Sequence, residues 1–185
     1  MSEATKPTSG CLLIAEPFLG DPNFERSVIL LCEHNTKGSF GLVLNQLSNL
    51  TLKDAIDDCY VEIPLHVGGP VEHNTLHYIH RLGDLIPGSV NLGRNLYWSG
   101  DFETLKTLVN VGQVEEKDIR FFLGYSGWGE GQLDAEMNKN SWIVSDIDTD
   151  LIFDSKPEEF WRKILRGMGG SYKVMSNYPT DPRLN

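Results

Sequence analysis

The chain has 185 residues, of which 40% are hydrophobic and 23% charged, the proportions of an ordinary globular domain. Its formal net charge of −10 argues against direct nucleic-acid binding, which needs a basic surface to displace counterions from phosphates. No apolar run approaches the ~20 residues that a membrane helix requires, and the polar N-terminus lacks a signal peptide's apolar core.

The cysteine content favours a reducing compartment. Cys11, Cys32 and Cys59 are an odd number without a C-x-x-C pair, and two of them lie in apolar runs. Such thiols behave as small hydrophobic residues, so we expect a cytoplasmic protein. Residues 1–9 are predicted to be a disordered lead-in, and residues 10–185 to form one domain.

The first half of the chain is predicted to consist mainly of strands. Apolar runs bounded by turn residues indicate strands over 11–16, 27–32 and 40–44, with a hairpin loop at 35–38. Thr51, with Asp54 three residues later, predicts a capped helix over 52–59. Further strands are expected over 65–67, 76–82 and 96–98, the last within a segment rich in Gly, Pro and Asn.

Helices are expected to alternate with strands in the second half. The predicted helices span 101–111, 132–138 and 157–168, the last with a capping box formed by Ser155 and Glu158, and the predicted strands span 119–124 and 142–144. Together these elements predict an α+β domain: a mixed, largely antiparallel sheet with helices packed on it.

The glycine-rich block 124–131 is predicted to be a tight strand-to-helix turn. It resembles a G-x-S-x-G nucleophile elbow around Ser126, but Trp128 stands where the last glycine is required. An anion site at the helix start is opposed by Glu130 and Asp134, which would repel a phosphate. The remaining alternatives are a structural turn with Trp128 as a lid, or an aromatic cleft for an uncharged or cationic ligand.

The histidines and one arginine leave further alternatives open. His73, His77 and His80 would share a helical face suited to zinc, but the local sequence favours a strand, on which His77 and His80 point to opposite faces. We therefore expect no metal. Arg26 is predicted to pair with Asp21 as a structural ion pair, with capture of a carboxylate or phosphate as the alternative.

Several ordered blocks of the sequence resemble the bacterial AlgH/YqgE family from about Gly10 to Asn185. The most specific block is 124–128, Gly-Tyr-Ser-Gly-Trp, and the others are Leu13-Ile14-Ala15, Arg26-Ser27-Val28, Cys32, His34, Asn45, Gly68-Gly69-Pro70-Val71, His80, Gly131-Gln132-Leu133, Glu136 and Trp142. The resemblance implies a compact mixed-sheet fold in the cytoplasm. It implies no reaction, although members are often labelled transcriptional regulators, and alanine is frequent in the family where this chain has Ser126.

These observations favour a non-enzymatic regulatory protein that binds a small molecule or a partner protein. The predicted binding cleft comprises Arg26, Asn45, Gly68, Gly69, Pro70, Tyr125, Ser126, Gly127, Trp128 and Gln132. No cofactor, catalytic residue or metal ligand is expected. The alternative is a hydrolase-type enzyme that uses Arg26, His34 and Ser126, which would then have to lie within about 4 Å of one another or of one small cavity.

Overall fold

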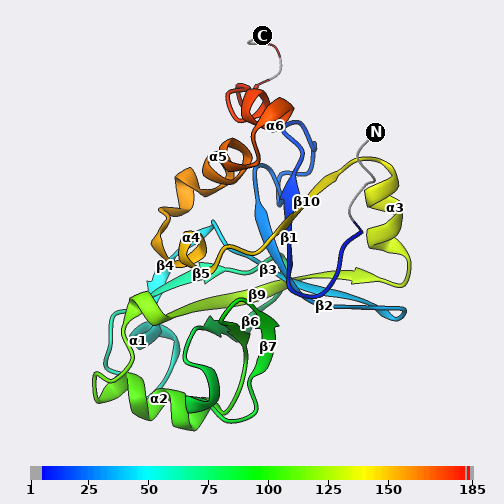
Figure 1. Ribbon diagram of the computed structural model, residues 1–185. Helices are drawn as coiled ribbons and strands as arrows, with labels where there is room; N and C mark the ends of the chain where they lie inside the picture. Colours follow the sequence, from blue (N-terminus) through cyan, green and yellow to red (C-terminus); the bar gives the residue numbers. More distant parts are fainter. Residues whose placement is uncertain (1–5, 182, 184–185) are drawn as a thin grey trace.

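The computed structural model describes residues 6–181 and 183, and its centre is a strongly curved sheet (Figure 1). The strands are β1 (Cys11–Ala15), β2 (Val28–Asn35), β3 (Gly38–Val43), β4 (Leu47–Thr51), β5 (Pro64–Val67), β6 (Val71–His80), β7 (Val90–Gly93), β8 (Leu96–Trp98), β9 (Ile119–Gly129) and β10 (Trp142–Asp146). Their order is β10-β1-β2-β3-β9-β6-β8-β7, and β4 is attached through β5 to β9. All pairings are antiparallel except that of β5 with β9.

Helices cover this sheet in three places. They are α1 (Leu52–Ala55), α2 (Phe102–Asn110), α3 (Gln132–Asn138), α4 (Thr149–Asp154), α5 (Pro157–Met168) and α6 (Gly170–Met175), with 3-10 turns η1 (Gly83–Leu85) and η2 (Glu116–Asp118). Figure 1 shows α4, α5 and α6 on one side, α1 and α2 at the opposite end, and α3 beside β10. The predicted α+β architecture is therefore confirmed.

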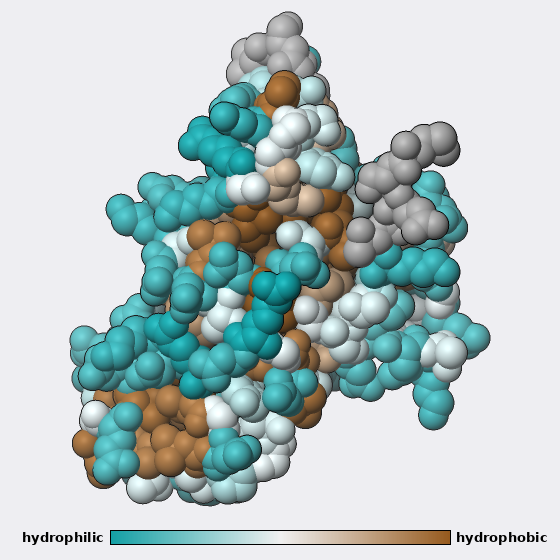
Figure 2. All heavy atoms as spheres, viewed as in Figure 1, coloured by the Kyte–Doolittle hydropathy of each residue, from teal (hydrophilic) through white to brown (hydrophobic). Residues whose placement is uncertain are grey.

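Each helical group closes its own part of the hydrophobic core. Phe160, Trp161 and Leu165 of α5 pack on strands β1, β2 and β9, whereas Leu105 and Val109 of α2 pack with Phe121 on the other face of β9. Figure 2 shows hydrophobic side chains gathered at the end that carries α1 and α2, and hydrophilic ones across the middle of this face. Among the described residues, no helix is both long and apolar enough to cross a membrane.

The turn predicted over 124–131 is wrong for most of its length, because β9 continues to Gly129. Residues 126–129 pair with β3, so they form the C-terminal part of β9 instead of a turn. The change of direction comes later, at Gly131, which has a φ of 69°, and α3 then begins at Gln132 as predicted.

Further differences concern strands β4 and β7, which the sequence did not predict, α1 and the C-terminal helices. The capping box at Thr51 is present, but α1 ends at Ala55 instead of residue 59. The predicted capping box at Ser155 is absent: Lys156 occupies the N-cap position of α5, and the Ser155 hydroxyl makes no hydrogen bond. The sequence interpretation also missed α4 and α6.

Residues 1–5 of the predicted lead-in lie outside the described residues. Residues 7–9 pack on the domain: Pro7 is buried, the Thr8 carbonyl accepts a hydrogen bond from the Cys11 amide, and the Ser9 hydroxyl oxygen accepts one from the His34 amide.

Candidate functional site

The glycines of the predicted cleft allow strands to approach one another closely. A side chain on Gly68 would collide with the carbonyl oxygen of Gly124, and one on Gly69 with that of Tyr125. Gly124 itself has a φ of 67°, and a Cβ there would lie 2.7 Å from the Val71 carbonyl oxygen. The glycines that sequence reasoning assigned to a ligand cleft are thus needed where β5 and β6 flank β9.

Tyr125 and Trp128 face opposite sides of the sheet, as expected for residues three apart on a strand. Tyr125 stacks on Phe40, with ring centroids 4.8 Å apart. Trp128 is buried in a different core cluster, and its indole Nε1 donates to Glu136 at 2.9 Å. Gln132 braces the end of β9 by accepting from the Gly129 amide at 3.0 Å. These aromatic residues therefore do not line one cleft.

Two polar residues of the predicted site are occupied by structural hydrogen bonds. Asn45 accepts from the Val28 amide at 2.8 Å and donates to the Arg26 carbonyl at 2.9 Å, so it joins the end of β3 to the start of β2. Ser126 is fully buried and its hydroxyl donates to the Gly68 carbonyl oxygen at 3.1 Å.

The three residues of the hydrolase alternative do not converge. Arg26 precedes β2 and His34 lies near its far end, so roughly 20 Å of extended strand separates them. His34 hydrogen-bonds Ser39, whereas Ser126 bonds Gly68. This arrangement cannot form a nucleophile, its base and an orienting cation.

Arg26 also differs from its predicted pairing. Its guanidinium donates to the Tyr178 carbonyl oxygen at 2.6 Å and lies 4.8 Å from the Trp161 ring centroid. No ion pair with Asp21 is recorded in the described part of the chain. Arg26 thus ties the C-terminal segment to the domain.

His73, His77 and His80 lie on β6, so the predicted strand at this place is confirmed. His77 packs against Phe40 and Tyr125, whereas His80 bonds to Ser89 and to the Ser99 carbonyl. Across residues 6–181 and 183, no group of three or more His, Cys, Asp or Glu side chains is arranged to hold a metal ion.

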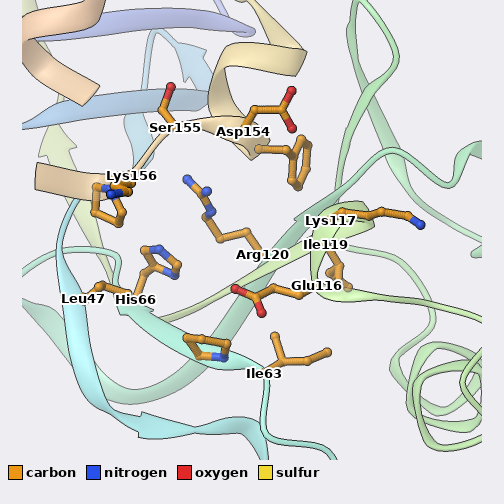
Figure 3. A pocket seen from close by; sticks show the side chains of 13 residues that line it. Leu47, Ile63, His66, Glu116, Lys117, Ile119, Arg120, Asp154, Ser155 and Lys156 are labelled. Carbon is orange, nitrogen blue, oxygen red and sulfur yellow. The ribbon is translucent and has the colours of Figure 1, made fainter. Parts of the chain in front are cut away.

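A pocket of about 520 Å³ lies elsewhere, between the β4–β5 region and the segment that joins α4 to α5 (Figure 3). Its size is typical of small-molecule sites. The walls combine apolar and charged side chains: Leu47, Ile63, Pro64, His66, Glu116, Lys117, Ile119, Arg120, Phe153, Asp154, Ser155, Lys156 and Pro157.

Arg120 of β9 occupies the middle of this pocket, with its guanidinium directed toward the α4–α5 segment (Figure 3). The residue is only 9% exposed, and burial lowers the pKa of its side chain to about 10, so it remains cationic at neutral pH. Its one recorded hydrogen bond runs from Nη1 to the Leu44 carbonyl at 3.3 Å. Among the described residues Arg120 has no carboxylate within ion-pair distance.

Two further buried polar groups flank Arg120 in Figure 3. His66 of β5 is 6% exposed, and neither ring nitrogen has a hydrogen-bond partner. Burial, assisted by the charge of Arg120, lowers the pKa of His66 to about 3, so the ring is neutral. A contact with the Phe121 backbone acts in the opposite direction, although it does not meet hydrogen-bond geometry. Ser155, also 6% exposed, has an unpartnered hydroxyl. Buried polar groups rarely remain unpaired, so this cluster suits a polar ligand.

Phe153 forms the aromatic wall between two arginines. The carbon at the centre of the Arg81 guanidinium lies 5.0 Å from the ring centroid, and that of Arg120 lies 5.9 Å from it. Arg81 is held by Asp150 at 3.2 Å and Asp118 at 3.9 Å. Arg81 is therefore neutralised and supports the wall, while Arg120 remains available to a ligand.

Sequence reasoning missed this pocket, although a signal was present. Arg120 interrupts the apolar run 119–123, and His66 lies between Leu65 and Val67. A lone polar residue in a buried strand requires a partner. The sequence could not show that β5 and β9 pair in parallel and place His66 opposite Phe122, two residues from Arg120.

Comparison with known proteins gives a consistent result over nearly the whole chain. The model of the AlgH-like family matches residues 12–173. A UPF0301 protein of Cytophaga hutchinsonii is 51% identical, covering 96% of this chain and 99% of that protein, and one of Parabacteroides distasonis is 45% identical, covering 97% and 92%.

Solved structures agree with this match. The solution structure of the AlgH protein from Pseudomonas aeruginosa is similar to this fold with a TM-score of 0.75 and 30% identity, covering 97% of this chain and 98% of that chain. Protein DIP2367 from Corynebacterium diphtheriae shares the fold with a TM-score of 0.76 at 23% identity, and 95% of each chain is covered. The chain therefore belongs to the AlgH-like family.

Proposed function

We propose that this chain is a regulatory ligand-binding protein that catalyses no reaction and captures the carboxylate of a small organic acid at Arg120. The observation that carries this proposal is the buried guanidinium in an open pocket, with one recorded hydrogen bond and no recorded ion pair. A desolvated cation costs stability unless it is paired. An anionic ligand supplies the missing partner.

The shape and chemistry of the pocket favour a carboxylate on an apolar body. The planar guanidinium presents parallel N–H donors that match the two oxygens of a carboxylate. Leu47, Ile63 and Phe153 supply apolar surface around it. Glu116 and Asp154 line the pocket together with Lys117 and Lys156, so with Arg120 the walls carry three cations and two carboxylates. One net positive charge matches a single carboxylate better than a doubly charged phosphate ester.

A binding role is supported over catalysis by the way the polar groups are arranged. Ser155 and His66 each lack a hydrogen-bond partner, so the imidazole does not activate the hydroxyl as a nucleophile. Both groups are instead free to orient a bound molecule.

We further place this protein in the cytoplasm and assign its regulatory effect to a protein partner instead of DNA. Cys11, Cys32 and Cys59 are free and buried, as suits a reducing compartment. The cations of α5 share its surface with acidic residues, and Lys163 pairs with Glu159 at 3.5 Å, so this helix offers a mixed surface. These observations count against direct transcriptional control through nucleic-acid contacts.

Thermal unfolding with a panel of carboxylates tests this function. Benzoate, 3-phenylpropionate and 3-phenyllactate should raise the melting temperature saturably, since a ligand at 100 times its Kd adds about 2.7 kcal/mol. Equal concentrations of sodium chloride and 3-phenylpropanamide should not.

Arg120→Met is the decisive variant, and Arg162→Gln is its matched control because Arg162 lies exposed on α5. Arg120→Met should lose the ligand response. Its own free energy of unfolding should stay the same or rise by about 1–2 kcal/mol, because a desolvated charge is replaced by apolar atoms. The proposal fails if no carboxylate stabilises the wild type, or if Arg120→Met keeps the response.

A further inference from the structure

His66 narrows the chemistry of the molecule that this pocket accepts. The imidazole is neutral, so it carries one N–H donor and one nitrogen lone pair that can only accept. Neither nitrogen is satisfied by the protein. A carboxylate offers acceptors alone, so it can satisfy Arg120 and the imidazole N–H but leaves the lone pair of His66 without a donor.

No other side chain of the pocket donates a hydrogen bond to the lone pair of His66 in the described structure. The Ser155 hydroxyl could donate, but it makes no hydrogen bond with His66. The Arg120 guanidinium has its recorded hydrogen bond with the Leu44 carbonyl, on β3's C-terminal side. A buried acceptor that stays unpaired costs enough binding free energy to discriminate between otherwise similar ligands.

We propose that the ligand carries a hydrogen-bond donor, either a hydroxyl or an amine, on the carbon next to its carboxylate. The site would then bind α-hydroxy acids or α-amino acids with apolar side chains. The carboxylate pairs with Arg120, the adjacent donor reaches His66, and the apolar side chain lies along Leu47, Ile63 and Phe153. This inference rests on the proposed carboxylate site.

Ligand access to His66 requires a local rearrangement. Both ring nitrogens of His66 are buried although the residue lines the pocket, so binding of the donor requires a rearrangement of neighbouring side chains. The charge of Glu116, at the pocket wall, distinguishes the two donor types, because it attracts an ammonium group and not a hydroxyl.

Calorimetric titration with three matched ligands tests the inference: 3-phenylpropionate, which has no donor, 3-phenyllactate, which has a hydroxyl, and phenylalanine, which has an ammonium. Wild type should bind the better of the two donor-bearing acids at least tenfold more tightly than 3-phenylpropionate. His66→Leu should bind all three with similar Kd, whereas His66→Gln, which keeps a donor and an acceptor, should retain the preference.

The outcomes separate this inference from the function on which it rests. If 3-phenylpropionate binds as tightly as both of its donor-bearing analogues, the carboxylate site stands and the inference about the donor is wrong. The inference is also overturned if His66→Leu keeps the preference. If none of the three acids binds, the carboxylate site and the inference fail together. A preference for phenylalanine that Glu116→Gln removes would identify the amine as the donor.

Discussion

At the scale of single residues, the pocket holds two of the four described side chains whose buried polar atoms lack a hydrogen-bond partner; the other two are Arg26 and Ser27. The side chains of Ser126 and Asn45 form hydrogen bonds with backbone groups, and Glu136 accepts hydrogen bonds from the indoles of Trp128 and Trp142. His66 and Ser155 keep buried polar atoms without partners. Such groups reduce stability, and we attribute their presence to ligand binding.

His66 should make the protein less stable in acid. Its pKa is lowered to about 3 by burial first and by Arg120 second, whereas an unfolded histidine titrates near 6.5. Between these values the unfolded state binds the extra proton, so stability falls as the pH falls. The loss from this residue between pH 7 and pH 5 should be about 2 kcal/mol.

Urea unfolding at the two pH values measures this loss, with His66→Gln as the reference because it cannot titrate. His77 and His80, whose pKa values burial also lowers, contribute to both proteins and cancel in the comparison. Equal losses in wild type and variant would contradict the assignment.

At the scale of elements, β9 organises the molecule, because it pairs with β3, β5 and β6 and carries Arg120. The same strand explains the main error of sequence-based reasoning. The glycines of 124–131 were interpreted as a turn, since glycine is common where φ is positive. Here Gly124 provides a close strand contact with Gly69 and Val71, which lie more than 50 residues away in sequence.

Gly124→Ala should therefore destabilise the fold by about 2–4 kcal/mol, because φ is 67° and the new Cβ would lie 2.7 Å from the Val71 carbonyl oxygen. Gly167→Ala provides the control. It lies in α5, and apart from the backbone of its own helical turn no atom lies within 4 Å of the position of the new Cβ, so it should stabilise by about 0.5–1 kcal/mol. Chemical denaturation measures both. A Gly124→Ala protein as stable as wild type would show that the close contact between Gly124 and Val71 tolerates a side chain.

Helices with a strong apolar stripe and clear end signals were predicted well from the sequence. The helix over 157–168 was predicted with its observed bounds, because its apolar stripe is strong and Pro157 marks its first turn. The short helix α4 was missed, although Asp148 caps it by accepting from the Leu151 amide at 3.0 Å. Strand pairing, and with it the pocket, depends on long-range contacts that periodicity does not report.

At the scale of the whole molecule, the curved sheet brings distant segments together. The turn between β7 and β8 reaches the other edge of the sheet: Arg94 lies 3.4 Å from Asp146 at the end of β10, and the Thr149 hydroxyl donates to the Arg94 carbonyl at 2.6 Å. This contact fixes the start of α4, and the segment that follows brings Phe153 within 5.9 Å of the Arg120 guanidinium and Ser155 to the same pocket. The pocket thus depends on the closure of the sheet.

The NMR signal of the Arg120 side-chain Nε–H group tests the carboxylate site most directly. The signal is identified by its loss in Arg120→Met, and 3-phenyllactate is then added to the wild type. The proposed site predicts a large, saturable shift of the Arg120 signal while that of exposed Arg162 stays unchanged. An Arg120 signal that does not move at saturating ligand would contradict the assignment of this pocket.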